Sequence, residues 1–159
     1  MKSSEANPAV SDAASLPKTL RLTLTHDLAA VPSAARRLQE FLEQNGVPEA
    51  DANVARLAFG EAANNAIQYA PLLTPAPVAT IQVERGGLLI AVEDHNPPFR
   101  FAPPPVPPSA DAESGRGHFL IAAVMDSVEY RREGGANMLR MRKRTRTKAE
   151  HSKTEILKS

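Results

Sequence analysis

A short glycine motif, Gly115-Arg116-Gly117, comes directly before an apolar segment that has the length of a helix. Glycines let a backbone approach a ligand closely, and the first turn of a helix offers unpaired amides and the positive end of its dipole. This combination suits a phosphate group. Arg116 is the only lysine or arginine between Arg100 and Arg131, so its positive charge could contact such an anion. Flexible loops also contain glycine pairs, and a single arginine can equally face water.

Two further motifs place polar side chains beside apolar segments. Glu61 and Asn65 are four residues apart, so a helix puts both on one face, at the border of an apolar stripe. Asp94 ends an apolar strand and precedes a sharp turn. Each has a simpler explanation by itself, as polar residues at a helix rim or as a turn-forming aspartate that binds backbone amides. The order of the three motifs along the chain is more informative than any one of them.

Hydrophobic periodicity predicts the elements that must position these residues. Alternation at Leu20, Leu22 and Leu24 predicts a strand. The pattern further predicts helices over residues 31–45, 49–70 and 118–125, and strands over 78–84, 88–92, 127–132 and 136–142. Residues 97–113 hold seven of the fourteen prolines and cannot form a regular element. The expected fold is an α+β two-layer sandwich with a mixed, mostly antiparallel sheet and helices on one face.

Length and composition limit the other possibilities. The 159 residues, 42% hydrophobic and 23% charged, suit one domain with one core. We expect a disordered arm over residues 1–17, a folded domain over 18–144 and a flexible polar and basic tail over 145–159. The lack of cysteine excludes disulfides, thiolate metal sites and cysteine nucleophiles. No apolar run approaches the ~20 residues that cross a bilayer, so we expect a cytoplasmic protein without a membrane partner.

Taken in order, the three motifs resemble those of the GHKL ATPase family, also called the Bergerat-fold family. More narrowly, they resemble the small single-domain serine/threonine kinases of bacteria that act as anti-sigma factors. Residues 57–69, Leu-Ala-Phe-Gly-Glu-Ala-Ala-Asn-Asn-Ala-Ile-Gln-Tyr, are similar to the first motif of that branch, and residues 115–130 to its last. The likeness covers about residues 20–143. The chain departs from the family at Asn96, where glycine is usual, and in its proline-rich loop.

The resemblance implies a role for each motif residue. Asn65 would bind Mg²⁺ through its side-chain oxygen, and the ion would bridge the phosphates of ATP. Glu61 would be the general base that takes the proton from the attacking hydroxyl. Asp94 would accept a hydrogen bond from the amino group of adenine. The other nucleotide-binding positions would be Asn96, Gly115, Arg116 (toward the γ-phosphate), Gly117 and His118, with the proline-rich loop as a lid.

The function that the resemblance implies is that of a partner-switching regulator. The protein would bind a sigma factor and keep it from RNA polymerase. It would also use Mg-ATP to phosphorylate a serine or threonine of a small anti-anti-sigma protein of the STAS type. The added negative charge would weaken that second contact. Because relatives form homodimers, we expect one here.

Three alternatives stay open at this stage. The first is a sigma-factor-binding module with a degenerate ATP site, which Asn96 and the prolines favour and the intact Glu61 and Asn65 oppose. The second is the ATP-binding half of a sensor histidine kinase, for which we find no phosphoacceptor helix pair. The third is nucleic-acid binding by the basic run at residues 140–148. We interpret that run as a strand edge and solvated tail, and expect no direct nucleic-acid partner, because the net charge is only +1 and no aromatic residue is interleaved.

Overall fold

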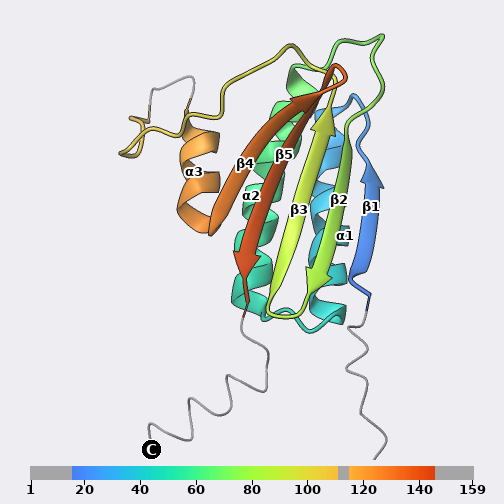
Figure 1. Ribbon diagram of the computed structural model, residues 1–159, viewed down its shortest axis with the longest axis vertical. Helices are drawn as coiled ribbons and strands as arrows, with labels where there is room; N and C mark the ends of the chain where they lie inside the picture. The colour runs from blue at the N-terminus through green and yellow to red at the C-terminus, as the bar shows by residue number, and fades with distance from the viewer. Residues whose placement is uncertain (1–15, 111–114, 146–159) are drawn as a thin grey trace, which may run out of the picture.

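The computed structural model describes residues 16–110 and 115–145. The described strands form one five-stranded sheet. Figure 1 shows two layers, this sheet and a layer of helices on one of its faces. The strands are β1 (Lys18–Thr23), β2 (Val78–Glu84), β3 (Gly87–Asp94), β4 (Ser127–Glu133) and β5 (Ala136–Arg144). The helices are the 3-10 helix η1 (Leu28–Ala30), α1 (Val31–Gln44), α2 (Glu49–Gln68) and α3 (Arg116–Val124). This arrangement confirms the expected α+β two-layer fold.

The strands lie in the order β1-β2-β3-β5-β4, and all four neighbouring pairs are antiparallel. No parallel pair occurs among the described residues, so the sheet is antiparallel rather than mixed. β5 lies between β3 and β4, although β4 precedes it in the chain. We had expected the basic run that begins at Arg140 to lie on an edge strand. The strand order shows that this expectation was wrong. Since the register places Arg140 opposite Ala91, an inner strand carries this charge.

The core forms where the alternating apolar positions of the sheet meet α1 and α2. α2 begins after Pro48, and Glu49 and Asp51 in its first turn interact favourably with the positive end of the helix dipole. Small side chains on its inner face let the helix approach the sheet closely; the buried alanines are Ala52, Ala55, Ala58, Ala62, Ala63 and Ala66. Larger residues from α1 and the strands fill the remaining space. Packing therefore fixes the position of α2, the helix that carries Glu61 and Asn65.

The ends of several elements differ from the sequence prediction in ways that affect the site. α3 begins at Arg116 rather than at residue 118, so Gly115 is its N-cap residue, with a left-handed φ of 88°. β3 extends beyond residue 92 to Asp94, which confirms that Asp94 ends this strand. η1 was not predicted. Nearly all of the expected N-terminal arm and C-terminal tail lies outside the described residues, since only residues 16, 17 and 145 of them are included.

None of the helices in residues 16–110 and 115–145 is both long and apolar enough to cross a bilayer.

Candidate functional site

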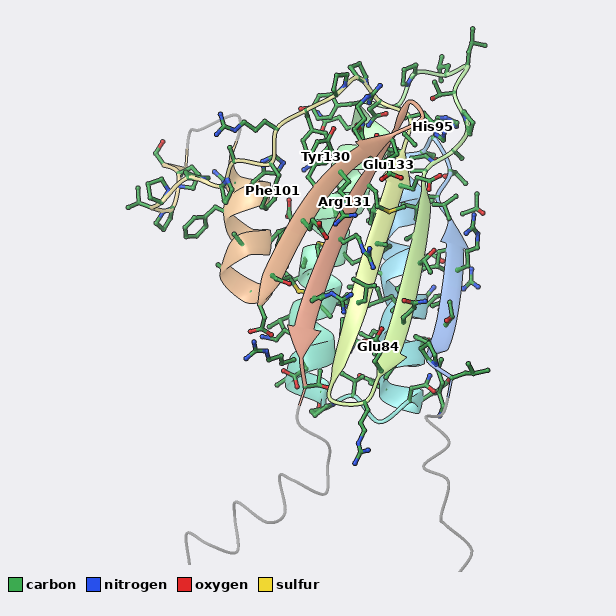
Figure 2. All side chains as sticks on the ribbon, viewed as in Figure 1. Glu84, His95, Phe101, Tyr130, Arg131 and Glu133 are labelled. Carbon is green, nitrogen blue, oxygen red and sulfur yellow. The ribbon has the colours of Figure 1, made fainter. Side chains whose placement is uncertain are left out.

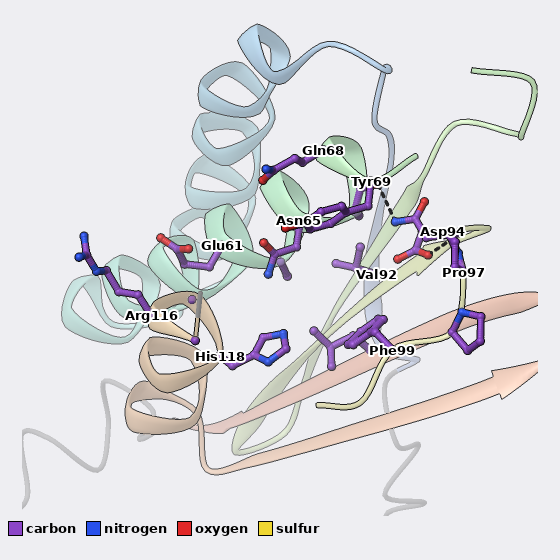
Figure 3. Close-up of a pocket in the computed structure, with 17 residues that line it drawn as sticks. Glu61, Asn65, Gln68, Tyr69, Val92, Asp94, Pro97, Phe99, Arg116 and His118 are labelled. Carbon is purple, nitrogen blue, oxygen red and sulfur yellow. Dashed lines mark hydrogen bonds between the residues drawn. The ribbon is translucent and has the colours of Figure 1, made fainter. Parts of the chain in front are cut away.

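A cavity of about 570 Å³ lies between α2, α3, the end of β3 and the loop that follows β3. Figure 3 shows Glu61 and Arg116 at one end of it and Asp94 and Pro97 at the other. All eight residues singled out in the sequence line this cavity: Glu61, Asn65, Asp94, Asn96, Gly115, Arg116, Gly117 and His118. Segments far apart in the chain thus meet at one site.

At the Glu61 end of the cavity, α2 faces the first turn of α3. A Cβ atom added at Gly117 would lie 2.9 Å from Glu61 Oε2 and 3.6 Å from Asn65 Nδ2. The missing side chain at residue 117 therefore lets the start of α3 approach both polar groups. Within the described residues, neither Glu61 nor Asn65 forms a side-chain hydrogen bond with the protein. A carboxylate, an amide and the unpaired amides of a helix start are thus available to a ligand.

This end fits a magnesium–phosphate group by the chemistry of its donors. Carboxylate and amide oxygens suit Mg²⁺, which is usually held by one or two protein groups together with substrate phosphates. In the part of the chain that the structure describes, no cluster of three or more histidine, cysteine, aspartate or glutamate residues could hold a metal ion. An ion here would therefore depend on ligand phosphates to complete its coordination.

Arg116 is placed differently from the other predicted residues. Its guanidinium donates hydrogen bonds to the carbonyl oxygens of Ser109 (3.4 Å) and Ala110 (2.6 Å), in the proline-rich loop. Figure 3 shows its side chain extending away from Asn65 and His118. In this structure Arg116 therefore connects the loop to the start of α3, and its charge does not point into the cavity.

At the opposite end, Asp94 is buried, with 6% of its surface exposed. Its Oδ1 accepts hydrogen bonds from the backbone amide of Asn96 (2.9 Å) and from Asn137 Nδ2 (2.8 Å). The turn-forming role expected of an aspartate at a strand end is thus present. No other hydrogen bond reaches the carboxylate from the described residues, so Oδ2 remains available as an acceptor for a ligand.

Asn96, which departs from the usual glycine, is accommodated without a left-handed backbone. None of the described non-glycine residues has a positive φ. The Asn96 side chain is buried and donates a hydrogen bond from Nδ2 to the carbonyl oxygen of Ala66 (3.1 Å). That carbonyl lies in the last turn of α2, where helical partners are missing because the amide of Ala70 bonds to Ile67 instead. Asn96 therefore joins the turn after β3 to the end of α2.

Sequence reasoning missed a set of residues behind Asp94. Asn137 is 1% exposed, and its Oδ1 accepts hydrogen bonds from Tyr130 Oη (2.6 Å) and from an Arg132 nitrogen (2.7 Å). A signal did exist, because Asn137 shares the period-two phase of Leu139 and Met141, which face the core. A polar residue in the buried phase of a strand needs hydrogen-bond partners, and that requirement could have pointed to it.

An aromatic cluster closes one wall of the cavity. The ring of His118 lies 4.8 Å from that of Phe101 and 5.9 Å from that of Phe99, between ring centroids, and Phe99 lies 4.4 Å from Tyr130. Burial in this setting lowers the pKa of His118 below its ordinary value. The cluster joins α3, the start of the proline-rich loop and β4 on the side of the cavity opposite α2.

Comparison with known protein families shows the family to which the chain belongs. The family described as "Histidine kinase-like ATPase domain" matches residues 24–143, more than half of the chain. This protein belongs to that family. Membership agrees with the GHKL resemblance of the motifs and implies ATP binding. No curated protein matches the chain.

Two solved structures are similar to this chain, and the first of them supports the fold. The crystal structure of the RsbU and RsbW domains of Rv1364c from Mycobacterium tuberculosis is similar with a TM-score of 0.61 and 16% sequence identity, over 80% of this chain. The chain spans only 32% of that protein's length. The histidine kinase AdeS from Acinetobacter baumannii is similar over 82% of this chain and 68% of its own, at 15% identity and a TM-score of 0.46. At such identities the first likeness shows the fold alone.

Proposed function

We propose that this histidine kinase-like ATPase domain is an anti-sigma factor with serine/threonine kinase activity. It binds a sigma factor, and it uses Mg-ATP to phosphorylate an anti-anti-sigma protein of the STAS type. The observation that carries the proposal is the meeting of Glu61, Asn65, the start of α3 and the buried Asp94 in one cavity. A cytoplasmic location and a homodimer belong to the same proposal.

The phosphate end of the site is the Glu61 end of the cavity. Asn65 would hold Mg²⁺ through Oδ1, and the amides between Gly115 and Gly117 would receive phosphate oxygens. Mg²⁺ supplies charge neutralisation and orientation of the phosphates, which are the main needs of phosphoryl transfer. The acceptor hydroxyl oxygen bonds to the γ-phosphorus as the bond from that phosphorus to the β–γ bridging oxygen breaks, and ADP leaves. Glu61 takes the hydroxyl proton.

The base end is the Asp94 end of the cavity. Asp94 Oδ2 would accept a hydrogen bond from the exocyclic amino group of adenine, since Oδ1 is already used within the protein. The volume of about 570 Å³ is within the ~300–1,000 Å³ usual for small-molecule sites. The two ends together thus suit a ligand that has a base with an amino group at one end and a phosphate chain at the other.

The uncovered face of the sheet supports the proposed homodimer. Figure 2 shows side chains such as Glu84 and Arg131 along this face, with no helix of the described residues lying over it. Acidic and basic residues alternate there, including Arg142 and Glu84, whose side chains lie 3.7 Å apart. This open face gives a second copy a surface against which to pack.

Phosphate transfer from radiolabelled ATP tests the enzymatic part of the proposal. The purified chain, Mg²⁺ and a STAS-domain protein encoded in the same genome should give a labelled STAS protein. Glu61→Ala should reduce transfer by about 10²–10⁴-fold because the general base is lost. Glu49→Ala, an exposed position in the first turn of the same helix, is the matched control and should leave transfer unchanged. Transfer that survives Glu61→Ala would remove this residue from its role.

Complex formation with sigma factors tests the regulatory part. A stoichiometric complex with one sigma factor should form on size exclusion and should dissociate when the unphosphorylated STAS protein is added. A sigma-factor complex without any phosphate transfer would establish the non-catalytic module instead. The same columns with light scattering report whether the chain is a dimer.

A further inference from the structure

The side chain of Asn137 lies behind the cavity rather than in its lining. β5 begins one residue earlier, and the sheet register places Asn137 directly opposite Asp94 of β3. Its amide nitrogen donates to Asp94 Oδ1 (2.8 Å) and to the carbonyl oxygen of Asn96 (3.1 Å). A buried amide that does not line the cavity cannot contact a ligand there. It can, however, fix the orientation of the Asp94 carboxylate, which does line the cavity.

The hydrogen bonds to the Asn137 side-chain oxygen set the orientation of its amide group. Arg132 is a donor only, so the Asn137 atom that it contacts at 2.7 Å must be the oxygen. Tyr130 Oη contacts the same oxygen at 2.6 Å. The amide nitrogen is therefore turned toward Asp94, and Asp94 Oδ1 must act as an acceptor. The chain of contacts from Arg132 through Asn137 fixes which Asp94 oxygen faces the protein and which faces the cavity.

The turn after Asp94 is held by the same groups. Arg132 donates a second hydrogen bond to the carbonyl oxygen of Asn96 (3.0 Å), which Asn137 also contacts. The Asn96 side chain reaches the last turn of α2. The carboxylate is thus fixed relative to both β5 and the helix that carries Glu61 and Asn65.

We propose that Asn137 is a positioning residue that sets base specificity, a proposal that rests on the proposed nucleotide-binding function. By occupying Asp94 Oδ1 with an N–H donor, it keeps Oδ2 turned to the cavity as a hydrogen-bond acceptor. An acceptor at this place pairs with a base that has an exocyclic amino group, as in adenine. It opposes a base with a carbonyl oxygen there, as in guanine, because two acceptors then face each other.

Asn137→Asp tests this role, because it keeps the shape of the side chain and replaces the N–H donor by a carboxyl group. The introduced carboxyl can donate to Asp94 only when it carries a proton. The titratable and charged groups that face it are Asp94 from β3 and Tyr130 and Arg132 from β4. The preference for ADP over GDP should therefore fall about tenfold at alkaline pH and recover as the pH is lowered, a pattern that loss of packing alone would not give.

The measurement is calorimetric titration of the full chain with Mg-ADP and Mg-GDP at several pH values. Asn53→Asp is the matched control, since Asn53 is an exposed asparagine in α2 that bonds only Gln39, and it should leave the preference unchanged. An unchanged ADP/GDP ratio in folded Asn137→Asp at all pH values would overturn the positioning role. A wild-type chain that binds neither nucleotide would instead overturn the proposed function, and this inference with it.

Arg132→Met is the second variant, which keeps the test decisive if Asn137→Asp does not fold. Arg132 is exposed, so its loss should cost less stability than a change at the buried Asn137, yet it removes the donor that orients the Asn137 amide. The ADP preference should fall by about threefold, less than in Asn137→Asp because Tyr130 remains. Arg131→Met, the adjacent exposed arginine paired with Glu129, is its control. Equal preferences in Arg132→Met, Arg131→Met and the wild type would contradict the proposal.

Discussion

The two ends of the cavity are built in opposite ways. At the Asp94 end, the polar side chains are buried, and hydrogen bonds among the Asp94 carboxylate, the Asn137 amide and the Asn96 backbone hold the three residues in place. At the Glu61 end, Glu61 and Asn65 are half-buried and form no side-chain hydrogen bond within the described residues. The residues at the Asp94 end are held by hydrogen bonds within the protein, with Asp94 Oδ2 left as an acceptor for a ligand, whereas Glu61 and Asn65 have no such bonds from the described residues to hold them.

This difference separates two consequences of mutation. Removing a member of a buried hydrogen-bonded set leaves its partners unsatisfied, which costs about 1–3 kcal/mol of stability for each buried group. Removing an unbonded polar group at a cavity leaves the folded protein nearly unchanged and affects only the ligand. Substitutions at the Asp94 end should therefore lower stability, whereas substitutions at the Glu61 end should lower activity.

The largest expected effect is that of Asn65→Ala on phosphate transfer. Loss of the proposed Mg²⁺ ligand should reduce transfer by about 10²-fold or more, because positioning and charge neutralisation dominate this reaction. The melting temperature of the free protein should stay within about 1 °C of the wild type, since the Asn65 side chain forms no hydrogen bond within the described residues that the substitution would break. A large drop in melting temperature would contradict the contrast between the two ends.

Asn137→Ala should produce the converse result in thermal unfolding. It leaves Asp94, Tyr130 and Arg132 each without one hydrogen-bond partner. We expect a loss of about 2–3 kcal/mol and a fall in melting temperature of several degrees, even without nucleotide. Calorimetric unfolding of the free chain measures it. A melting temperature equal to that of Asn65→Ala would show that the hydrogen bonds behind Asp94 do not stabilise the fold.

Gly117→Ala sharpens the comparison within the Glu61 end. The added methyl would lie 2.9 Å from Glu61 Oε2, which is the mobile end of a side chain, so the carboxylate should move while the helices stay. Because a displacement of about 1 Å can cost up to ~10²-fold in rate, we expect transfer to fall about 10- to 100-fold with ADP binding retained. Gly60→Ala, where nothing lies within 4 Å of the added methyl, should leave transfer unchanged.

The smallest effect concerns pH and His118. Burial lowers the pKa of His118 in the folded protein below 6.5, so the unfolded chain takes up this proton first as the pH falls. Stability should therefore decline below that pH, and His118→Gln should show a smaller drop in melting temperature between about pH 7.5 and about pH 5.5 than the wild type. His26→Gln, an exposed histidine after β1, is the control. Equal drops in His118→Gln and the wild type would contradict the assignment.

Much of this fold could be predicted from local sequence patterns. The alternation of Leu20 and Leu22, the alanine-rich face of α2 and the glycine turns of the two hairpins each act over a few residues, so their elements were predicted with small errors at the ends. The motif residues Glu61, Asn65 and Asp94 also fall in one cavity, as their order along the chain indicated. Their roles in binding and catalysis remain proposals.

What could not be predicted depends on pairing between distant parts of the chain. Asn137 meets Asp94 across 43 residues of sequence, and only the register of β3 with β5 brings them together. The internal position of β5 likewise follows from strand order, which periodicity does not report. Arg116 forms a hydrogen bond with the proline-rich loop because of the conformation of that loop. The prolines in the sequence exclude a regular element there but do not predict the conformation.

The strand order has a consequence for the nascent chain on the ribosome. Glu61, Asn65 and Asp94 emerge early, but the cavity needs α3 from one side and Asn137 from β5 behind it, and β5 comes after the other strands of residues 16–110 and 115–145. A chain that stops before β5 can form the β2–β3 hairpin and the two long helices, yet it leaves the edge of β3 unpaired. The pocket is therefore among the last parts of this domain to be assembled, and a bound ligand there would preferentially stabilise chains whose translation has passed the end of β5.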